Sequence, residues 1–310
     1  MRTVTIFGGS GFVGRYIVQK FVDKGYLIRV AVRNPLAANY LKPLGEVGQI
    51  TPVQASILSS QEVERAILGA DVVVNLVGIL YEKGSQTFEK IHVEGAKNVA
   101  EKAKKLEVST LLHMSALGAN KDSLSRYASS KARGEEAVLK AFPTATVFRP
   151  SVIFGPEDAF FNRFAEMARL SPFLPLIGGG KTRFQPIYVG DVAECFLKAA
   201  FKKEAQGKTY ELGGPEIYSF KQLMGYLLKT IHRRRLLLPL PFPLAKVMAT
   251  FAQVLPTPPL TPDQVELLKS DTVVSPKAHT AKELGVHLNA MEALAPLYLT
   301  RYCPAGKAER

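Results

Sequence analysis

Three features of the sequence predict an α/β fold built on a parallel sheet with helices on both faces. Short apolar runs alternate with amphipathic helical patterns through the first half of the chain. The runs are apolar throughout, as in residues 71–77 (DVVVNLV), which is typical of strands buried on both faces. A glycine-rich turn at residues 8–14 joins the first expected strand to the first expected helix.

The expected elements follow one another in strand–helix order. The first helix has Val13, Ile17 and Phe21 on one face and Gly25 as a plausible C-cap. Ser59 can cap a later helix through its hydroxyl group. The expected strands are residues 3–7, 27–32, a run ending at 53, 71–77, 110–114 and 145–148. The expected helices are residues 12–24, 59–68, 88–106, 127–142 and 192–201.

These elements predict a Rossmann-type, doubly wound parallel sheet with a smaller, interleaved C-terminal region. We expect an NAD(P)-binding core at residues 1–155 and a substrate-side or partner-side region at residues 156–310. A long loop is marked by Pro172, Pro175 and three glycines at 178–180, and residues 182–201 are expected to return to the core.

The composition excludes several classes of protein. The 310 residues are 47% hydrophobic and 22% charged, which excludes a wholly disordered chain. Cys195 and Cys303 are the only cysteines, and the five histidines form no metal-binding motif, so we expect neither a disulfide scaffold nor a metal site. We find no targeting segment and no apolar run long enough to span a bilayer, and we expect a cytoplasmic protein.

The net charge of +13 is spread over several segments. Residues 1–50 carry seven Lys or Arg against two acids, and residues 201–250 carry nine against three, including the run 233–235. Such an excess is either a solvated surface or a surface for an anionic cofactor or lipid. Nucleic acid is not an expected partner, because basic and aromatic residues are not interleaved in any known reader motif.

The glycine-rich turn carries the strongest chemical signal. Its sequence, GGSGFVG, contains Gly8, Ser10, Gly11, Phe12, Val13 and Gly14. Glycines let the backbone approach a pyrophosphate, and the first turn of the following helix offers N–H groups without intrahelical partners. The turn therefore predicts a dinucleotide-binding site.

The end of the second expected strand indicates which dinucleotide is bound. A chain that binds NAD usually has an acidic residue there, which bonds the ribose 2′-hydroxyl. Here the strand ends in Arg33, and Arg15 follows the third glycine of the turn. A cation at this place suits a 2′-phosphate, so we expect a preference for NADP(H) over NAD(H).

Several strings resemble the extended and atypical branch of the short-chain dehydrogenase/reductase superfamily. Besides the glycine turn, they are NLVG at 75–78, YASSK at 127–131, RPSVIFGP at 149–156 and FQPIYVGDVA at 184–193. Three further strings resemble the NADPH-binding accessory subunits of respiratory complex I and their bacterial relatives. They are LVGILYE at 76–82, FGPED at 154–158 with FNRF at 161–164, and LIGGG at 176–180. The resemblance covers about residues 1–275.

The resemblance implies one of two functions. The first is a structural, NADP(H)-binding accessory protein of complex I, peripheral on the inner membrane. The second is an NADPH-dependent oxidoreductase or epimerase, acting on an isoprenoid quinone intermediate in ubiquinone biosynthesis or on a nucleotide sugar. In both cases it implies contacts with the dinucleotide from Ser56, Ile57, Leu76, Val77, Gly78, Pro150 and Val152.

In active members of the superfamily a Tyr acts as general acid and base beside a Lys. Here Tyr127 and Lys131 are four residues apart, so both side chains lie on one helix face. An ammonium group beside a phenol favours the phenolate and lowers the pKa of the tyrosine. Ser115 is the candidate for the third catalytic residue.

Three departures weaken the prediction of turnover. Ser115 precedes Tyr127 by only 12 residues, about half the usual spacing, so the loop that normally shapes a substrate site is short. His92 stands where related chains commonly have the Asn that anchors a proton-relay water, and Ser56 replaces an acid. His92 is expected either to substitute for that Asn or, preferably, to be a packed histidine with its hydrogen bonds satisfied.

The segment 233–255 forms a second constellation. Leu244, Val247, Met248, Phe251 and Leu255 share one face of an expected helix, with Lys246, Thr250 and Gln253 opposite. This stretch follows the basic run, and the prolines of residues 236–262 exclude a spanning helix. It is expected to pack as core, to dock on a partner subunit or to lie on an anionic membrane surface. Exposure of the apolar face in the fold distinguishes the first possibility from the other two.

Overall fold

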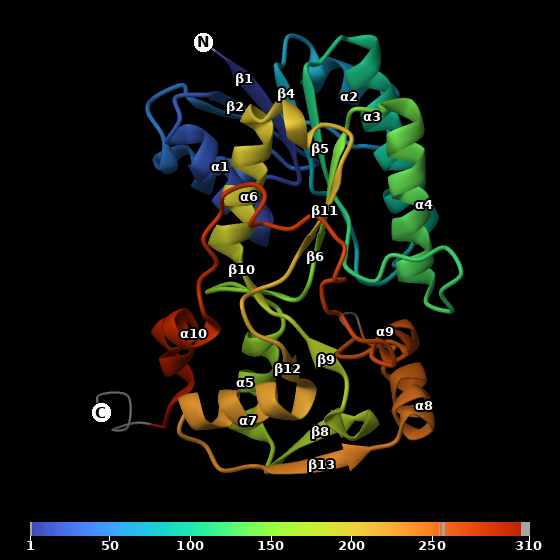
Figure 1. Ribbon diagram of the computed structural model, residues 1–310, viewed down its shortest axis with the longest axis vertical. Coiled ribbons are helices and arrows are strands. Elements are labelled where there is room, and N and C mark those ends of the chain that lie inside the picture. Colours follow the sequence, from blue (N-terminus) through green and yellow to red (C-terminus); the bar gives the residue numbers. More distant parts are fainter. Residues whose placement is uncertain (1, 254, 256–257, 305–310) are drawn as a thin grey trace. The chain divides into compact units, whose positions relative to one another are not determined.

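The computed structural model describes residues 2–253, 255 and 258–304 (Figure 1). The chain divides into two compact units. The first comprises Met1–Pro150, Val189–Leu212 and Pro276–His287, and the second comprises Ser151–Tyr188, Gly213–Ser275 and Leu288–Arg310. The sequence predicts a boundary after residue 155 and a return to the core over residues 182–201. In the structure the first segment of the first unit ends at Pro150, and the chain returns to this unit over Val189–Leu212 and again over Pro276–His287.

A seven-stranded parallel sheet forms the centre of the first unit, in the order β11-β6-β5-β4-β1-β2-β3. The prediction of a doubly wound parallel sheet is thereby confirmed. Its register places Phe7 beside Ala31 on one side and beside Asn75 on the other. The strands are β1 (Thr3–Phe7), β2 (Leu27–Val32), β3 (Ile50–Gln54), β4 (Val72–Asn75), β5 (Thr110–Met114), β6 (Thr146–Pro150) and β11 (Thr209–Leu212).

Helices cover both faces of this sheet (Figure 1). Helices α1 and α6 pack together on one face, and α2, α3 and α4 pack in series on the other. Ser59 caps α2, as predicted, by accepting a hydrogen bond from the backbone N–H of Glu62. The helices of the first unit are α1 (Phe12–Val22), α2 (Ser60–Ile67), α3 (Ala96–Lys105), α4 (Arg126–Ala141) and α6 (Val189–Phe201), with short 3-10 segments η1 (Leu36–Leu44) and η4 (Lys203–Ala205).

The expected helix at residues 88–106 is confirmed as a continuous helical segment, but its first part is not α-helical. Residues Glu89–Gly95 form a π-helix, η2, and only Ala96–Lys105 is α-helical. The wider turn accompanies a very close approach to α4, where a Cβ on Gly134 would lie 2.0 Å from the carbonyl oxygen of His92. It also accompanies the burial of the His92 side chain, which is 2% exposed. π-Helical turns are often found at functional sites.

The second unit combines short two-stranded pairings with helices. Strand β8 (Phe173–Ile177) pairs with β13 (Leu236–Leu240) in parallel, β7 (Ile153–Phe154) pairs with β10 (Ile187–Tyr188), and β9 (Arg183–Phe184) pairs with β12 (Tyr218–Ser219). Its helices are α5 (Phe161–Leu170), α7 (Phe220–Thr230), α8 (Phe242–Ala252), α9 (Pro262–Leu267) and α10 (Met291–Leu299), with 3-10 turns η3 (Gly178–Gly180) and η5 (Thr300–Tyr302).

Each unit has its own apolar core. In the first unit a large cluster fills the space between the sheet and α2, α3 and α4, and includes Phe7, Val73 and Val99. In the second unit Phe161, Phe184 and other apolar side chains pack between α5, α7 and α10. Interior packing of this kind is dense, so small changes of volume at its closest contacts are felt.

The approach of α4 to η2 gives a test of the fold. We expect Gly134→Ala to destabilise the protein by about 2 kcal/mol or more, because the new methyl group would overlap the His92 carbonyl oxygen. The matched control is Gly225→Ala in α7, where an added Cβ meets nothing within 4 Å. The control should be neutral or slightly stabilising in chemical denaturation. Equal stability of the two variants would contradict the packing described.

Candidate functional site

The glycine turn follows β1 and is shaped by two close backbone contacts. Gly8 has a positive φ of 79°, and the N–H of Gly11 donates to the carbonyl of Gly8 over 3.0 Å. A Cβ on Gly14 would lie 2.4 Å from that carbonyl oxygen, so only glycine fits there. Helix α1 begins after Gly11 without a side-chain cap and with no acid in its first turn. Its first N–H groups, including those of Phe12 and Val13, have no intrahelical acceptors and suit an anion.

The side chain of Tyr40 covers this turn. Its hydroxyl donates to the carbonyl of Ser10 over 2.7 Å, and the Arg15 guanidinium carbon lies 5.2 Å from the centre of its ring. Arg33 follows the last residue of β2 and is exposed. Residues 33–45 contain no Asp or Glu. Tyr40 belongs to none of the sequence motifs, so only the fold shows that it lies against the glycine turn.

Ser56 and Ile57 lie just beyond β3. The N–H of Ser56 donates to the Glu62 carboxylate over 2.7 Å, which holds the start of α2 against this turn. Ile57 is 5% exposed, and its carbonyl accepts a hydrogen bond of 2.7 Å from the Asn98 amide. Both residues therefore have fixed backbone positions at the carboxyl end of the sheet.

The loop after β4 adjoins the glycine turn. The N–H of Leu76 donates to the carbonyl of Phe7 over 3.0 Å, and the N–H of Val77 donates to the side chain of Asn75 over 3.1 Å. An added Cβ on Gly78 would lie 3.5 Å from His92 Nε2 and 3.9 Å from Lys131 Nζ. The predicted residues of this loop thus lie beside the predicted Lys.

His92 joins this loop to α4 through both ring nitrogens. Its Nε2 accepts a hydrogen bond of 3.0 Å from the N–H of Ile79, so Nδ1 carries the proton and donates to Ser130 Oγ over 2.9 Å. Ser130 in turn donates to the carbonyl of Tyr127. Burial, with a smaller contribution from the Lys131 charge, lowers the pKa of His92 to about 3. The prediction of a packed histidine with satisfied hydrogen bonds is confirmed.

Tyr127 and Lys131 lie on α4 as predicted. The Tyr127 ring is in edge contact with Phe88 and His92, with centroid distances of 5.9 and 5.4 Å. Lys131 is 5% exposed, and its Nζ donates to the carbonyl of Met114 over 2.7 Å. Burial lowers the pKa of Lys131 to about 8, although the nearby Glu135 opposes the shift.

Ser115, the third candidate, is bonded elsewhere. Its hydroxyl donates to the buried carboxylate of Glu135, which also accepts three hydrogen bonds from the Arg149 guanidinium at 2.6–3.1 Å. The hydrogen bonds to Glu135 raise the pKa of Arg149. Ser115 is 4% exposed, and the residue after it is Ala116, which has no hydroxyl. The geometry favours a structural role for Ser115.

The last two predicted residues fall in different units. Pro150 ends β6 in the first unit, and its carbonyl accepts a hydrogen bond of 2.9 Å from the N–H of Leu117. Val152 belongs to the second unit, where its carbonyl accepts from the N–H of Ile187 over 2.9 Å. Of these two residues, Pro150 therefore belongs to the same unit as the other predicted site residues.

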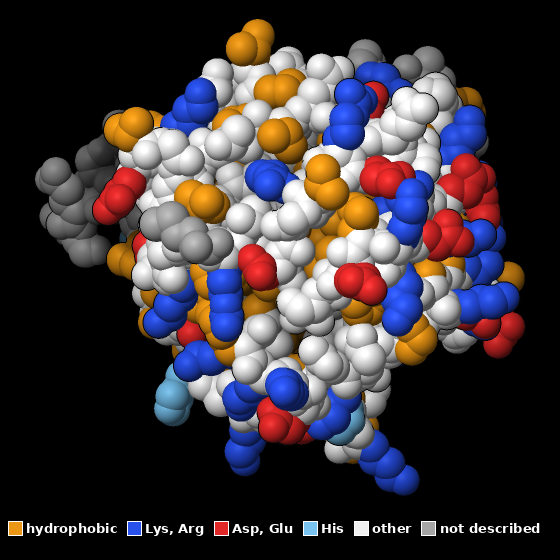
Figure 2. Space-filling model, turned by 90° about the horizontal axis from the view of Figure 1, so that it is seen from above, with side chains coloured by type: hydrophobic (Ala, Val, Ile, Leu, Met, Phe, Trp, Pro, Cys, Tyr) orange, Lys and Arg blue, Asp and Glu red, His pale blue; other side chains and the backbone are white. Residues whose placement is uncertain are grey.

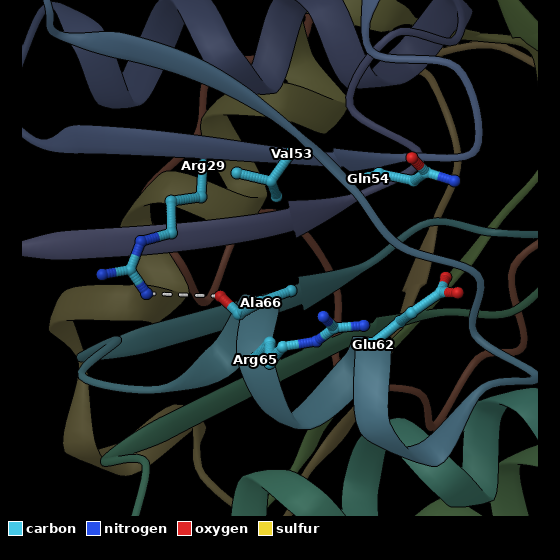
Figure 3. A pocket seen from close by; sticks show the side chains of 6 residues that line it. All are labelled: Arg29, Val53, Gln54, Glu62, Arg65 and Ala66. Carbon is cyan, nitrogen blue, oxygen red and sulfur yellow. Dashed lines mark hydrogen bonds between the residues drawn. The ribbon is translucent and has the colours of Figure 1, made fainter.

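A pocket of about 400 Å³ lies beside β2, β3 and α2 (Figure 3). Arg29 and Arg65 point to different sides of it, and Arg29 donates to the carbonyl of Ala66 at the end of α2. Arg29 therefore serves as a cap for α2 rather than as a free anion-binding group. No residue predicted to bind the dinucleotide lines this pocket. Its lining consists of Arg29, Val53, Gln54, Glu62, Arg65 and Ala66.

The sequence pattern of the NAD dependent epimerase/dehydratase family matches residues 4–213. The chain belongs to this family. The resemblance that the sequence motifs indicate is thereby confirmed, and the glycine turn, the β4 loop and the Tyr–Lys helix of this family member all lie within the matched region.

The similarity to complex I subunits covers nearly the whole chain. A relative from Arabidopsis thaliana, "NADH dehydrogenase [ubiquinone] 1 alpha subcomplex subunit 9, mitochondrial", is 35% identical over 97% of this chain and 78% of its own length. The protein of the same name from Mus musculus is 32% identical over 96% of this chain and 80% of its own length. The second resemblance stated from the sequence is therefore also confirmed.

Solved structures confirm the fold. The crystal structure of a UDP-glucose 4-epimerase from Thermotoga maritima, with UDP-glucose, has a TM-score of 0.71 at 18% identity, and the match covers 97% of this chain and 98% of the other. A dTDP-glucose 4,6-dehydratase from Streptomyces venezuelae, solved with NAD and TYD, has a TM-score of 0.72 at 16% identity, covering 97% and 96% of the two chains.

The residues missed by the sequence analysis of this family member are Glu135, Arg149, Ser130 and Tyr40. Glu135 had a usable signal, since it lies four residues after Lys131 on the same helix face. Within the described ranges, no cluster of three or more His, Cys, Asp or Glu residues could hold a metal ion. In the same residues, no helix has both the length and the apolar character that crossing a bilayer requires.

The buried His92 predicts a specific dependence of stability on pH. The unfolded chain takes up a proton on this imidazole near pH 6.5, whereas the folded protein resists it down to about pH 3. The contribution of His92 is therefore present above pH 6.5 and is lost as the pH falls toward 3. We expect His92→Asn to cost about 1–3 kcal/mol at pH 7.5 and to flatten this acid slope in thermal unfolding.

His113 is also buried with a lowered pKa. Because it is present in the parent protein and in His92→Asn, it contributes equally to the acid slope of both. The matched control is His287→Asn, at an exposed histidine, which should keep the slope of the parent protein. An unchanged slope in His92→Asn would show that the imidazole is not held neutral.

Proposed function

We propose that this chain holds a nicotinamide dinucleotide, with NADP(H) preferred, as a structural group of an accessory subunit of respiratory complex I. The observation that carries the proposal is the similarity to complex I subunits over almost the entire chain. The location that follows is peripheral, on the inner membrane. This proposal includes the predicted cytoplasmic location, with the chain attached to the cytoplasmic face of the inner membrane.

The residues of the first unit fit such a group. The glycine turn is bare where a pyrophosphate would approach, because Gly14 has no room for a Cβ and α1 begins without a capping side chain. Lys131 lies beside Gly78 with its ammonium group held on the Met114 carbonyl, where it can also bond a ribose. When bound, the nicotinamide would supply hydride chemistry. The residues of the first unit that would hold the dinucleotide are Gly8, Ser10, Gly11, Phe12, Val13, Gly14, Arg33, Ser56, Ile57, Leu76, Val77, Gly78, Tyr127, Lys131 and Pro150.

Three contacts support holding rather than turnover. Both nitrogens of His92 are bonded within the protein, so neither can anchor a relay water. The hydroxyl of Ser115 is bonded to Glu135. A ligand present at a hundredfold excess over its Kd adds about 2.7 kcal/mol to the free energy of unfolding without reacting, so a retained dinucleotide can serve stability alone.

The preference for NADP(H) rests on the basic edge of the site. Arg33 directly follows β2, no acid occurs between it and Glu46 in the sequence, and Arg15 lies against Tyr40 near the glycine turn. We expect Arg33→Ala to weaken NADPH binding about tenfold or more while NADH binding changes little, because only NADPH carries the 2′-phosphate. Isothermal titration with both dinucleotides measures this. Lys24→Ala, which precedes β2, is the control, and equal losses for the two dinucleotides would remove the assignment.

The association with complex I is tested by purification of the tagged full chain from the membranes of its host in mild detergent. We expect complex I subunits in stoichiometric amounts, together with NADP(H) released on denaturation. Tyr127→Phe should leave the association with complex I subunits unchanged, because the variant keeps the ring that contacts Phe88 and His92.

The contrary outcome is a partner-free protein in which Tyr127→Phe abolishes an NADPH-dependent reaction. That result would establish the alternative function, an oxidoreductase or epimerase that acts on a quinone intermediate or a nucleotide sugar. Screening the purified chain with NADPH and these two substrate classes distinguishes the possibilities.

A further inference from the structure

Helix α8 is oriented with its small residues inward and its large apolar residues outward. Ala245 and Ala249 are buried against Val265 and Ile177, whereas Leu244, Val247 and Met248 are 52–53% exposed and Phe251 is 75% exposed. A helix at the surface of a globular protein normally turns its large apolar side chains toward the core. The core-packing possibility for this face is thus wrong, and the exposed side chains need another explanation.

The orientation of α8 is fixed by its first turn. The ring of Phe242 fills the space beside Gly178, where an added Cβ would lie 2.2 Å from the ring. Helices α8 and α9 lie side by side in the second unit (Figure 1). The alanine face is therefore held on α9, and α8 cannot rotate to bury the large residues without losing these contacts.

Exposed apolar side chains continue from α8 into β13 and its partner β8. Leu236 and Leu238 are two residues apart on β13, and Leu236 is paired with Phe173 on β8. All three are 45–68% exposed. Strands β8 and β13 and helix α8 lie along one end of the second unit (Figure 1). We call the exposed side chains of these three elements the apolar rim. The rim consists of Phe173, Leu236, Leu238, Leu244, Val247, Met248 and Phe251.

The segment that contains β13 and α8 carries only basic charges. The 46 residues 217–262 contain no Asp or Glu, six Lys or Arg and one His. Arg234 and Lys246 in this stretch are exposed. On the neighbouring helices, Glu166 of α5 pairs with Arg169 and Glu266 of α9 pairs with Lys269, while Asp263 is a further acid in the first turn of α9. By contrast, Figure 2 shows a face of the molecule on which basic and acidic side chains are intermixed.

We propose that the apolar rim lies in the interface of an anionic lipid bilayer, with α8 parallel to the membrane plane. This deepens the peripheral location given under the proposed function and rests on it for the identity of the membrane. Apolar burial and attraction of cations to anionic headgroups add together in such binding, and no acid of residues 217–262 opposes it. Lys246 can extend its ammonium group to the headgroups while its stem stays among the apolar side chains.

The test uses the purified full chain and two kinds of vesicle, phosphatidylcholine alone and phosphatidylcholine mixed with phosphatidylglycerol. We expect sedimentation with the anionic vesicles only, weakened by salt. Replacing Val247, Met248 and Phe251 by Ser should lower the partition coefficient about tenfold or more, because the buried apolar area is lost. The double variant Arg234→Gln with Lys246→Gln should reduce binding to the anionic vesicles, because it removes two exposed cations.

Matched controls separate the rim from general stickiness and from misfolding. Ser replacements at Leu36, Val47 and Leu124, which are at least as exposed but lie in the first unit, should leave vesicle binding unchanged. Lys24→Gln with Lys104→Gln is the control for charge. All variants should keep the unfolding transition and the dinucleotide affinity of the parent, since none lies in the dinucleotide site.

Two results would overturn the proposal. The first is absence of binding to anionic vesicles by the parent chain. The second is a rim variant that binds vesicles normally but no longer purifies with complex I subunits, which would make a protein the occupant. Vesicle binding without any complex I association would instead remove the proposed function and leave the lipid surface intact, so the two failures are distinguishable.

Discussion

The first unit depends on one buried imidazole. His92 accepts from the N–H of Ile79 and donates to Ser130, and so connects the loop after β4, the π-helical turn and α4. Because the ring is neutral and both nitrogens are used, it acts as a fixed spacer between these elements. The close contact of Gly134 with the His92 carbonyl oxygen belongs to the same junction.

The same junction determines what the site can do. Holding a dinucleotide needs a bare glycine turn and a positioned Lys131, and both are present. Turnover needs side-chain groups that are left available to substrate and water. Here the corresponding groups, the His92 nitrogens and the Ser115 hydroxyl, are bonded to other parts of the protein. Buried polar groups of this kind are costly to release, so the network stabilises the positions of these elements.

The two units differ in how they use apolar and charged residues. The sheet of the first unit is covered by helices on both faces, and acids and bases alternate in pairs such as Glu64 with Lys102 and Lys105. The second unit leaves large apolar side chains of α8 and β13 exposed in a stretch without acids. A chain with this division is suited to hold a ligand in one unit and to contact a surface with the other.

The sequence by itself determined the parallel sheet, the glycine turn and the Tyr127–Lys131 pair, because local periodicity, glycine spacing and helical i,i+4 geometry are properties of short segments. It also limited His92 to two roles. Only the tertiary structure decided between them, showed that Glu135 accepts hydrogen bonds from both Ser115 and Arg149, and showed which face of α8 is buried. These features depend on contacts between residues far apart in the chain, and hydrogen-bond partners or burial across such distances leave no periodic signal.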